Sequence, residues 1–402
     1  MNAHDDRVNG DEVANESLYR PVPALRLGIA STAVILLLFV TAGATSQFLN
    51  PGFGVWFTEV FIFLGVPFVL TRFSLRDPVR WPGMAFPGWA PAAIGLAFGL
   101  VNFFGVVAPI QFAMQALFPR DLTEFFDSSR IFENQSTADL ALIISGVIIA
   151  APWCEEYFFR GVLQQSIQSA QTVNERRGAT VAMLVTAFLF SLFHFDPVGF
   201  LARFELGLLF GWLFWRTGSI WPGALAHAAN NGISTVIFFA SGPETAQQAE
   251  QAVTREDVMQ ILVFAAMGAL LLAGLLLLVH ARPHLLSRRA HPEVVLPPSS
   301  FWKLAAPWLV AGTLSIGLLI AVDLRGIQLR LVDTEYPLPR DLAGELEASR
   351  QELLQLRRRA RAGEVPIDTY ESERRELSRL TGDGARAPLP ETMPPTPSPP
   401  IE

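Results

Sequence analysis

The sequence predicts an all-α fold: a polytopic integral membrane helical bundle of about eight or nine transmembrane helices with a C-terminal helical hairpin. Of the 402 residues, 51% are hydrophobic and only 17% are charged, whereas soluble chains carry roughly 25% charged residues. Residues 1–20 and 323–402 together hold 34 of the 67 charged residues. The chain between them is therefore too poor in charge for a soluble domain, and it contains repeated apolar runs of membrane-spanning length.

Nine apolar runs are long enough to cross the roughly 30 Å of hydrocarbon in a bilayer. They lie at 25–48, 53–71, 88–110, 138–169, 179–195, 198–215, 219–240, 257–280 and 302–322. A polar N-terminal tail, 1–24, precedes this transmembrane domain of residues 25–322. Arginines gather in three of the connections, and counting spans alternately places these connections on one side of the bilayer. The positive-inside rule then predicts a cytoplasmic N-terminus.

Two stretches outside the spans carry helical patterns. Residues 111–136 mix aromatic and charged side chains, which indicates either short amphipathic helices at the membrane interface or an ordinary loop. In the polar tail, 323–402, leucines recur at helical spacing until Gly363 interrupts the pattern, and Asp368 is placed to cap a second helix. We therefore expect a cytoplasmic or periplasmic helical hairpin over 341–380, followed by a proline-rich disordered end.

The fourth run, 138–169, carries charged side chains in its middle. Charges inside a span are costly, so they are usually paired and functional. The i,i+4 spacing of Glu156 and Arg160 places them on one helix face, where they can form an ion pair, and Glu155 points about 100° further round. We therefore expect Arg160 to neutralise Glu156, while Glu155 faces a cavity. The alternative is a helix that ends at Cys154 and leaves all three charges solvated at the interface.

Two histidines and an asparagine favour the buried arrangement. His194 closes the fifth run, and His227 and Asn231 lie in the seventh. At 1.5 Å per residue, Glu155 and His194 each lie about 22 Å from the connection between their helices, so they are level across an antiparallel pair. The same count from Gly218 places Asn231 at about the depth of Glu155, with His227 one turn away. A single buried histidine is more often a core residue, but four such groups at one depth indicate a site.

This set of side chains suits hydrolysis by an activated water. A carboxylate acts as a general base toward water, and Glu155 and Glu156 are the candidates. The histidines either stabilise the oxyanion or bind a Zn²⁺ ion that activates the water, and Asn231 donates to the same oxyanion. The helical H-E-x-x-H signature is absent, so a zinc site would be assembled from three helices by His194, His227 and Glu155 or, alternatively, Glu156. The metal-free and Zn²⁺ forms both stay open. No serine or cysteine has a comparable set of partners.

These residues resemble the motifs of a known family. Glu155-Glu156-x-x-x-Arg160, Phe190-x-x-x-His194 and His227-x-x-x-Asn231 are similar to the three motifs of the CPBP intramembrane proteases, which include the CAAX prenyl protease 2 type and the bacteriocin-processing or self-immunity (Abi) proteins. The resemblance implies a helical membrane fold in which Glu155 activates water, while His194, His227 and Asn231 position it or bind metal. It also implies cleavage of a peptide bond, in eukaryotic relatives after prenylated C-terminal cysteines.

We therefore expect a CAAX-protease-like intramembrane endopeptidase with its catalytic core at 138–240, acting on a peptide or membrane protein. Two other classes stay open: a transporter that uses the same buried Glu/His set, and a catalytically idle membrane scaffold or immunity protein that binds a protein partner through the C-terminal hairpin. The net charge of −7 and the lack of a long basic stripe argue against nucleic acid. The expected location is the bacterial inner (cell) membrane.

Overall fold

The computed structural model describes residues 20–132, 135–170, 175–248, 255–288, 294–339, 342 and 344–384. In these residues every regular element is a helix, and the one β-type pairing is an isolated bridge between Arg76 and Val295. The all-α class predicted from the sequence is therefore confirmed. The chain forms two compact units, unit 1 (Met1–Ser315) and unit 2 (Ile316–Glu402). Most of the N-terminal tail and the proline-rich end lie outside the described residues.

Four long helices of unit 1 contain π-helical turns. They run as α2 (Ala24–Leu38), η1 (Phe39–Gly43) and α3 (Ala44–Leu49); α4 (Pro51–Phe57), η2 (Thr58–Gly65) and α5 (Val66–Phe73); α6 (Trp89–Asn102), η3 (Phe103–Val107) and α7 (Ala108–Leu117); and α9 (Thr137–Ser145), η5 (Gly146–Ala150), α10 (Ala151–Glu156), η6 (Tyr157–Gln164) and α11 (Gln165–Ser169). Pro67, Pro109 and Pro152 each stand at the second residue of an α-helix that follows a π turn. A proline has no N–H to donate, so the helix rearranges where that bond is missing.

The remaining described elements of unit 1 contain no π turns. They are α8 (Arg120–Phe125), η4 (Ser128–Phe132), α12 (Glu175–Leu192), α13 (Phe200–Thr217), α14 (Trp221–Gln248), α15 (Arg255–Ala281), η7 (Pro283–Leu286) and the first part of α16 (Phe301–Glu335). Residues 111–136 were expected to form either short amphipathic helices or a loop. The short helices α8 and η4 lie in this segment.

Six helical stretches are long and apolar enough to cross a membrane. Within the described residues these are Ala24–Leu49, Pro51–Phe73, Trp89–Leu117, Thr137–Ser169, Val258–Ala281 and Phe301–Glu335. The protein is therefore an integral membrane protein. Helices α12, α13 and α14 occupy three further predicted spans but are not among these six. The expected number of eight or nine spans stays a prediction.

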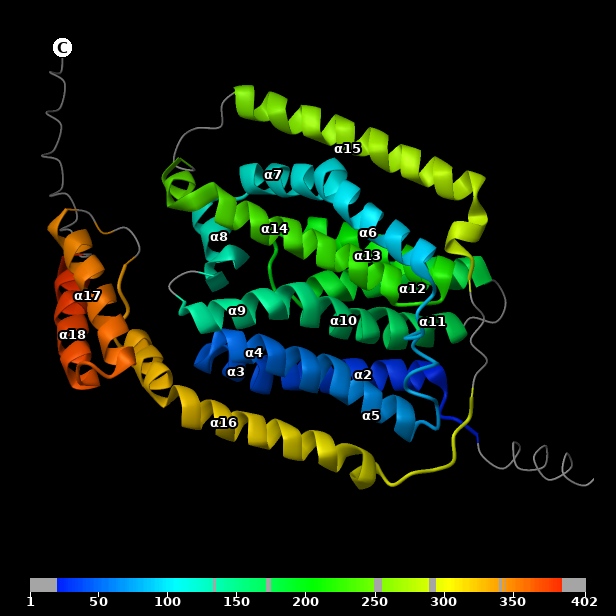
Figure 1. Ribbon diagram of the computed structural model, residues 1–402, viewed down its shortest axis with the longest axis horizontal. Coiled ribbons are helices and arrows are strands. Elements are labelled where there is room, and N and C mark those ends of the chain that lie inside the picture. Colours follow the sequence, from blue (N-terminus) through cyan, green and yellow to red (C-terminus); the bar gives the residue numbers. More distant parts are fainter. Residues whose placement is uncertain are drawn as a thin grey trace, which may run out of the picture. The chain divides into compact units, whose positions relative to one another are not determined.

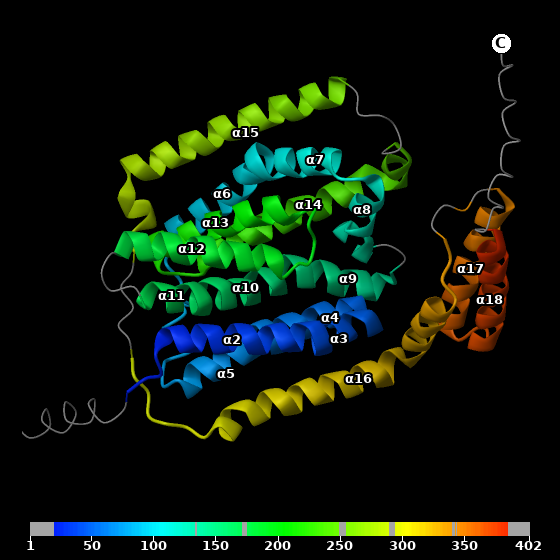
Figure 2. The same ribbon diagram turned by 180° about the vertical axis from the view of Figure 1, so that it is seen from behind.

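Close helix contacts in unit 1 hold α14 and α12 in position (Figures 1 and 2). Helix α10 lies between α14 on one side and the α4–η2–α5 helix on the other. Gly99 of α6 faces α14 so closely that a Cβ atom there would lie 2.4 Å from the carbonyl oxygen of Ala226. Gly207 of α13 meets α12 in the same way, since a Cβ atom would lie 2.7 Å from the Cα of Ala187. Such contacts between small residues are typical of membrane helices.

The arginine-bearing connections of unit 1 meet at one end, which we call the arginine end (residues 72–83, 175–177, 215–218 and 282–288). Arg76 donates to the carbonyl oxygen of Val22 at 2.7 Å, and Arg288 forms an ion pair with Glu175. The backbone N–H of Ile220 donates to Gly83 at 3.1 Å. This arrangement agrees with the alternate counting of spans that underlies the topology prediction.

Unit 2 consists of the last part of α16 with α17 (Glu345–Ala362) and α18 (Ile367–Gly384). Its buried apolar side chains are Leu329, Val332, Leu353, Ala360, Tyr370 and Leu377. Gly363 ends α17 with φ of +82°, a left-handed conformation that favours glycine. The structure therefore contains a helical hairpin in the tail, although Asp368 lies in the first turn of α18 and not at its cap. Unit 2 begins at Ile316, before the expected boundary at 323, because α16 continues into it.

Candidate active site

Two adjacent glutamates at the end of α10 occupy different surroundings. The side chain of Glu156 is fully buried, and its Oε1 accepts a hydrogen bond from Nη1 of Arg160 at 2.8 Å. Arg160 is also fully buried and lies one turn later, in η6. The i,i+4 spacing therefore produces a buried, charge-assisted hydrogen bond. Oε2 of Glu156 and Nε of Arg160 are buried without a partner among the described residues, so the hydrogen-bond capacity of the pair is only partly used.

Other contacts hold the Arg160 guanidinium in place. Nη2 donates to the carbonyl oxygen of Gly207 of α13 at 3.1 Å. The guanidinium carbon lies 4.7 Å from the ring centroid of Phe190 and 5.2 Å from that of Phe210. Cation–π contacts of this kind stabilise a cation most when water is excluded. Arg160 thus links η6 to both α12 and α13.

Glu155 has no such partner. Its side chain is 9% exposed, and Oε2 is buried without a hydrogen bond to any described residue. Its charge interacts with those of Glu156 and of His227. A buried carboxylate oxygen without a hydrogen-bond partner is rare, since leaving it unsatisfied costs about 1–3 kcal/mol or more. Glu155 therefore presents an acceptor to the interior of the site.

His227 of α14 lies beside the ion pair. Its Nδ1 is 3.6 Å from Oε1 of Glu156, and its ring stacks on Phe210 with a centroid distance of 5.1 Å. Only 5% of the residue is exposed. The 3.6 Å separation is too long for a hydrogen bond, but it places the imidazole in the field of the Glu156 carboxylate. The neighbouring phenylalanine fixes the plane of the ring.

His194 lies just beyond the end of α12, and it reaches the same aromatic cluster. Its Nδ1 is 2.8 Å from the carbonyl oxygen of Phe190. A carbonyl oxygen only accepts, so Nδ1 carries the proton and a neutral ring leaves Nε2 with a free lone pair. The ring of Phe190 contacts both imidazoles, at 5.2 Å from His194 and 5.7 Å from His227. Phe190 therefore links the two imidazoles; His227 lies beside the ion pair, whereas His194 is exposed and its hydrogen bond and closest ring contact are both with Phe190.

Asn231 donates to the backbone carbonyl group of Val147, which lacks a backbone donor because residue 152 is a proline. In the π turn η5 the backbone N–H of Ala151 donates to the residue five positions earlier. By the same pattern Pro152 would donate to Val147, but proline has no N–H. Asn231 supplies the missing donor, because its Nδ2 donates to the Val147 carbonyl oxygen at 2.9 Å. The second N–H of the amide is left to donate elsewhere.

The depths expected from straight α-helices were wrong by about one turn. His227, not Asn231, lies level with the glutamates, as its contact with Glu156 shows. Asn231 lies further along, beside Val147. The error arises because the count of 1.5 Å per residue assumes α-helix throughout, whereas π turns shift the hydrogen bonds by one residue.

Three charged residues near the site were left unassigned by the sequence pattern. Glu59 of η2 is buried with Oε2 unpartnered among the described residues, and its charge interacts with that of Glu155. Arg203 forms a 2.6 Å ion pair with Asp196. Glu205 accepts a hydrogen bond from Asn102 at 2.8 Å. Their only signal in the sequence was a charge inside an apolar run, which does not identify the helix that each one faces.

The donor geometry does not fit a three-ligand metal site. Among the described residues, no three His, Cys, Asp or Glu side chains converge on one point where an ion could be held. Oε1 of Glu156 accepts from Arg160, and Nδ1 of His194 faces a carbonyl oxygen, which leaves Nε2 as the nitrogen of that ring that would hold an ion. We derive no step through a metal. The Zn²⁺ expectation stays a prediction, which metal analysis together with activity in chelator decides.

Comparison with known protein families gives one match, to the Type II CAAX prenyl endopeptidase Rce1-like family, over residues 137–233. No curated relative and no solved structure matches the chain. The matched segment begins with α9 and ends within α14, so it contains all the motif residues described above. The family resemblance predicted from the three motifs is therefore confirmed for this segment.

Proposed function

We propose, from the family match over residues 137–233, that the protein is an intramembrane endopeptidase in which Glu155 activates a water molecule. The observation that carries the mechanism is the buried Oε2 of Glu155, which has no partner among the described residues, beside a second glutamate that is already paired. Oε2 of Glu156 is likewise buried without a partner among the described residues, but the Glu156 carboxylate is bonded to Arg160 through Oε1, whereas no described cation is hydrogen-bonded to Glu155. We therefore assign the role of base to Glu155.

In the proposed reaction one proton passes from water to Glu155 and then from Glu155 to the leaving nitrogen. Glu155 removes a proton from water while the water oxygen bonds to the carbonyl carbon of the scissile peptide. The electron pair of the carbonyl moves to its oxygen, which forms a tetrahedral oxyanion. When the C–N bond breaks, Glu155 returns the proton to the leaving nitrogen. A positioned general base of this kind contributes about 10²–10⁴-fold in rate.

The other residues hold the reacting atoms. Nε2 of His194 is an acceptor in the neutral ring, so it can orient the attacking water by accepting its second proton in a hydrogen bond. The free N–H of Asn231 supports the oxyanion, a role whose loss costs about 10²–10³-fold in comparable hydrolases. Glu156 lies 3.6 Å from Nδ1 of His227 and limits the positions of that ring, and Arg160 holds the Glu156 carboxylate through the 2.8 Å hydrogen bond. Glu156 and Arg160 are therefore positioning residues.

The family name suggests the substrate class to test first. We propose a membrane-embedded peptide that carries a prenylated cysteine near its C-terminus, cleaved on the C-terminal side of that cysteine. The expected cellular setting is the bacterial inner membrane. The active-site residues lie on helices that are in contact with apolar spans, so a lipid-modified peptide can approach from the bilayer.

Peptide cleavage in proteoliposomes tests the proposal. The purified chain is incubated with a farnesylated C-terminal peptide and with its unprenylated copy, and mass spectrometry identifies the products. We expect release of the residues after the prenylated cysteine by the wild type and by Glu124→Gln, an exposed control on α8. No release from either peptide, with proton or solute flux that depends on Glu155, would instead support the transporter.

A further inference from the structure

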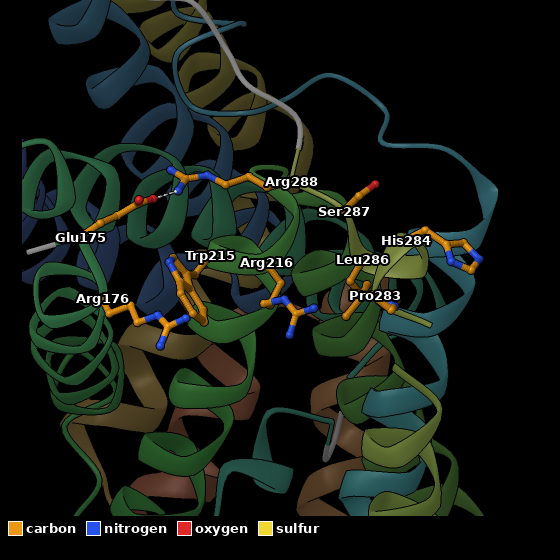
Figure 3. A pocket seen from close by; sticks show the side chains of 9 residues that line it. All are labelled: Glu175, Arg176, Trp215, Arg216, Pro283, His284, Leu286, Ser287 and Arg288. Carbon is orange, nitrogen blue, oxygen red and sulfur yellow. Dashed lines mark hydrogen bonds and ion pairs between the residues drawn. The ribbon is translucent and has the colours of Figure 1, made fainter. Parts of the chain in front are cut away.

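A cavity of about 620 Å³ opens at the arginine end of unit 1 (Figure 3). None of the candidate catalytic residues lines it. Its walls come from three places in the chain: Arg176 from α12, Trp215 and Arg216 from α13, and Leu286 and Arg288 from η7 and the residue stretch after it. A volume of this size lies within the range of about 300–1,000 Å³ that is usual for ligand sites.

The arginines that line this cavity outnumber its carboxylates. It contains one carboxylate, Glu175, which forms an ion pair with Arg288. Arg176 and Arg216 have no acidic partner among the described residues, and the Arg216 guanidinium instead lies 5.7 Å from the ring centroid of Trp212. Figure 3 shows the side chains of Arg176 and Arg216 reaching past Trp215 toward the same side of the cavity. Two guanidinium groups thus share one concave surface.

Ordinary interfacial arginines at the same end are arranged differently. Arg80 has a carboxylate nearby, Asp77, at 3.9 Å, and Arg72 donates to the carbonyl oxygen of Pro297 at 2.9 Å. Each of these contacts involves a single arginine. The cavity instead contains arginine side chains from separate helices. Their positive charges repel one another unless an anion lies between them.

We propose that this cavity binds the phosphate headgroup of an anionic phospholipid. Guanidinium groups bind phosphate oxygens in a bidentate way. Trp215 is a residue type enriched at the membrane–water interface, and Pro283 and Leu286 provide an apolar wall for the glycerol and the upper acyl chain. Basic pockets between membrane helices on the cytoplasmic side bind such headgroups. The topology predicted from the arginine-bearing connections places the cavity on that side.

Native mass spectrometry of the full chain in detergent tests this site. Phosphatidylglycerol is titrated into the wild type, into Arg176→Gln/Arg216→Gln, and into the control Arg80→Gln. An arginine near an anionic lipid surface is worth about fivefold in affinity, so the double variant should bind about thirty-fold more weakly. Arg80→Gln should bind within twofold of the wild type. If the double variant fails to fold, Arg216→Lys and Arg176→Gln alone should each weaken binding by several-fold.

Two further arms separate the sources of phosphate. Phosphatidylcholine, which has no net charge, should bind at least tenfold more weakly than phosphatidylglycerol, and inorganic phosphate at 10 mM should not displace the lipid. Equal affinity of the wild type and the cavity variants for phosphatidylglycerol would overturn the proposal. Displacement of the lipid by inorganic phosphate would also overturn it, because the cavity would then be a site for a free anion.

Discussion

At the scale of single residues, the buried Glu156–Arg160 pair is the strongest electrostatic constraint in the site. Both side chains are fully buried, and they are joined at 2.8 Å. Removing one partner leaves the other as an uncompensated charge in the interior, which is far more costly than removing both. A large loss of stability on removing one partner is therefore the mark of a positioning residue.

Glu156→Gln should destabilise the protein by about 3–5 kcal/mol, because it leaves the Arg160 charge unpaired. Denaturant or thermal unfolding in detergent measures this loss, with the exposed Glu124→Gln as a control that should change stability by less than about 0.5 kcal/mol. Replacing both residues, as Glu156→Leu/Arg160→Met, should recover much of the loss. A stability of Glu156→Gln equal to that of the wild type would show that the pair is not what fixes η6.

The sequence predicted this pair because i,i+4 spacing depends only on one helix. It could not place Glu59 in a helix that packs against α10, since η2 and α10 are about a hundred residues apart in the chain, and no periodicity reports which faces meet. The depth of Asn231 was also misjudged. The π turns of the α9–α11 helix change the register between its residues and those of α14, and the only trace of them in the sequence is Pro152.

At the scale of elements, the π turn η5 and helix α14 depend on each other. Pro152 leaves the Val147 carbonyl without a backbone donor, and Asn231 replaces it at 2.9 Å. The Asn231 side chain of α14 therefore completes the backbone hydrogen bonding of η5. A buried carbonyl left unpaired costs about 1–3 kcal/mol.

A double-mutant cycle tests this dependence. Asn231→Ala should destabilise the wild type more than it destabilises Pro152→Ala, because alanine at 152 restores the N–H that the Val147 carbonyl lacks. The expected interaction energy is about 0.5–3 kcal/mol, measured by unfolding of the four proteins. Additive effects of the two substitutions would contradict the account of Asn231 as a replacement donor.

The helical hairpin of unit 2 offers a separate test through Tyr370. Burial and the neighbouring carboxylate of Asp333, to which the phenol donates, raise the pKa of Tyr370 to about 12, above the ordinary value of about 10. An unfolded unit would ionise first, so the hairpin should lose stability as the pH rises from about 10 to about 12 and lose none below 10. Difference absorbance of tyrosinate, wild type minus Tyr370→Phe, should titrate near pH 12; a midpoint near 10 would mean that Tyr370 is solvated.

The leucine spacing predicted this hairpin because both helices bury one face against the other. Gly363 marked its turn, and the structure shows why: the chain there adopts a φ of +82°. The start of unit 2 was harder to predict. The composition changes at Asp323, where the charged tail begins and the backbone of α16 is non-helical, but unit 2 begins earlier, at Ile316, within the apolar run.

At the scale of the whole molecule, the sequence predicted the fold class well because hydrophobic length is set by the bilayer and not by tertiary contacts. The number of spans was less certain, since α12, α13 and α14 are less apolar than the six stretches: α12 begins with Glu175, Arg176 and Arg177, α13 contains Arg203 and Glu205, and α14 contains His227 and Asn231. The Thr137–Ser169 helix, which carries Glu155, Glu156 and Arg160, is long enough to be identified as a span despite these charges.

The orientation of unit 1 follows from its arginine end, which the positive-inside rule places in the cytoplasm. Cysteine substituted at exposed Ser287, at that end, should react with a membrane-impermeant maleimide only after cells are permeabilised. Cysteine at exposed Glu124, on the connection after α7, should react in intact cells. The native Cys154 is buried and gives little background. Labelling of the Ser287 variant in intact cells would reverse the predicted topology.

The central claim is that Glu155, and not its neighbour, acts as the base. The most direct measurement is kcat of Glu155→Gln on a cleaved peptide in proteoliposomes, taken together with its unfolding temperature. Our account predicts a fall in kcat of about 10²–10⁴-fold with an unfolding temperature close to that of the wild type, because Oε2 of Glu155 makes no hydrogen bond to the described residues that the substitution would break. A Glu155→Gln protein that cleaves the peptide at the wild-type rate would contradict it.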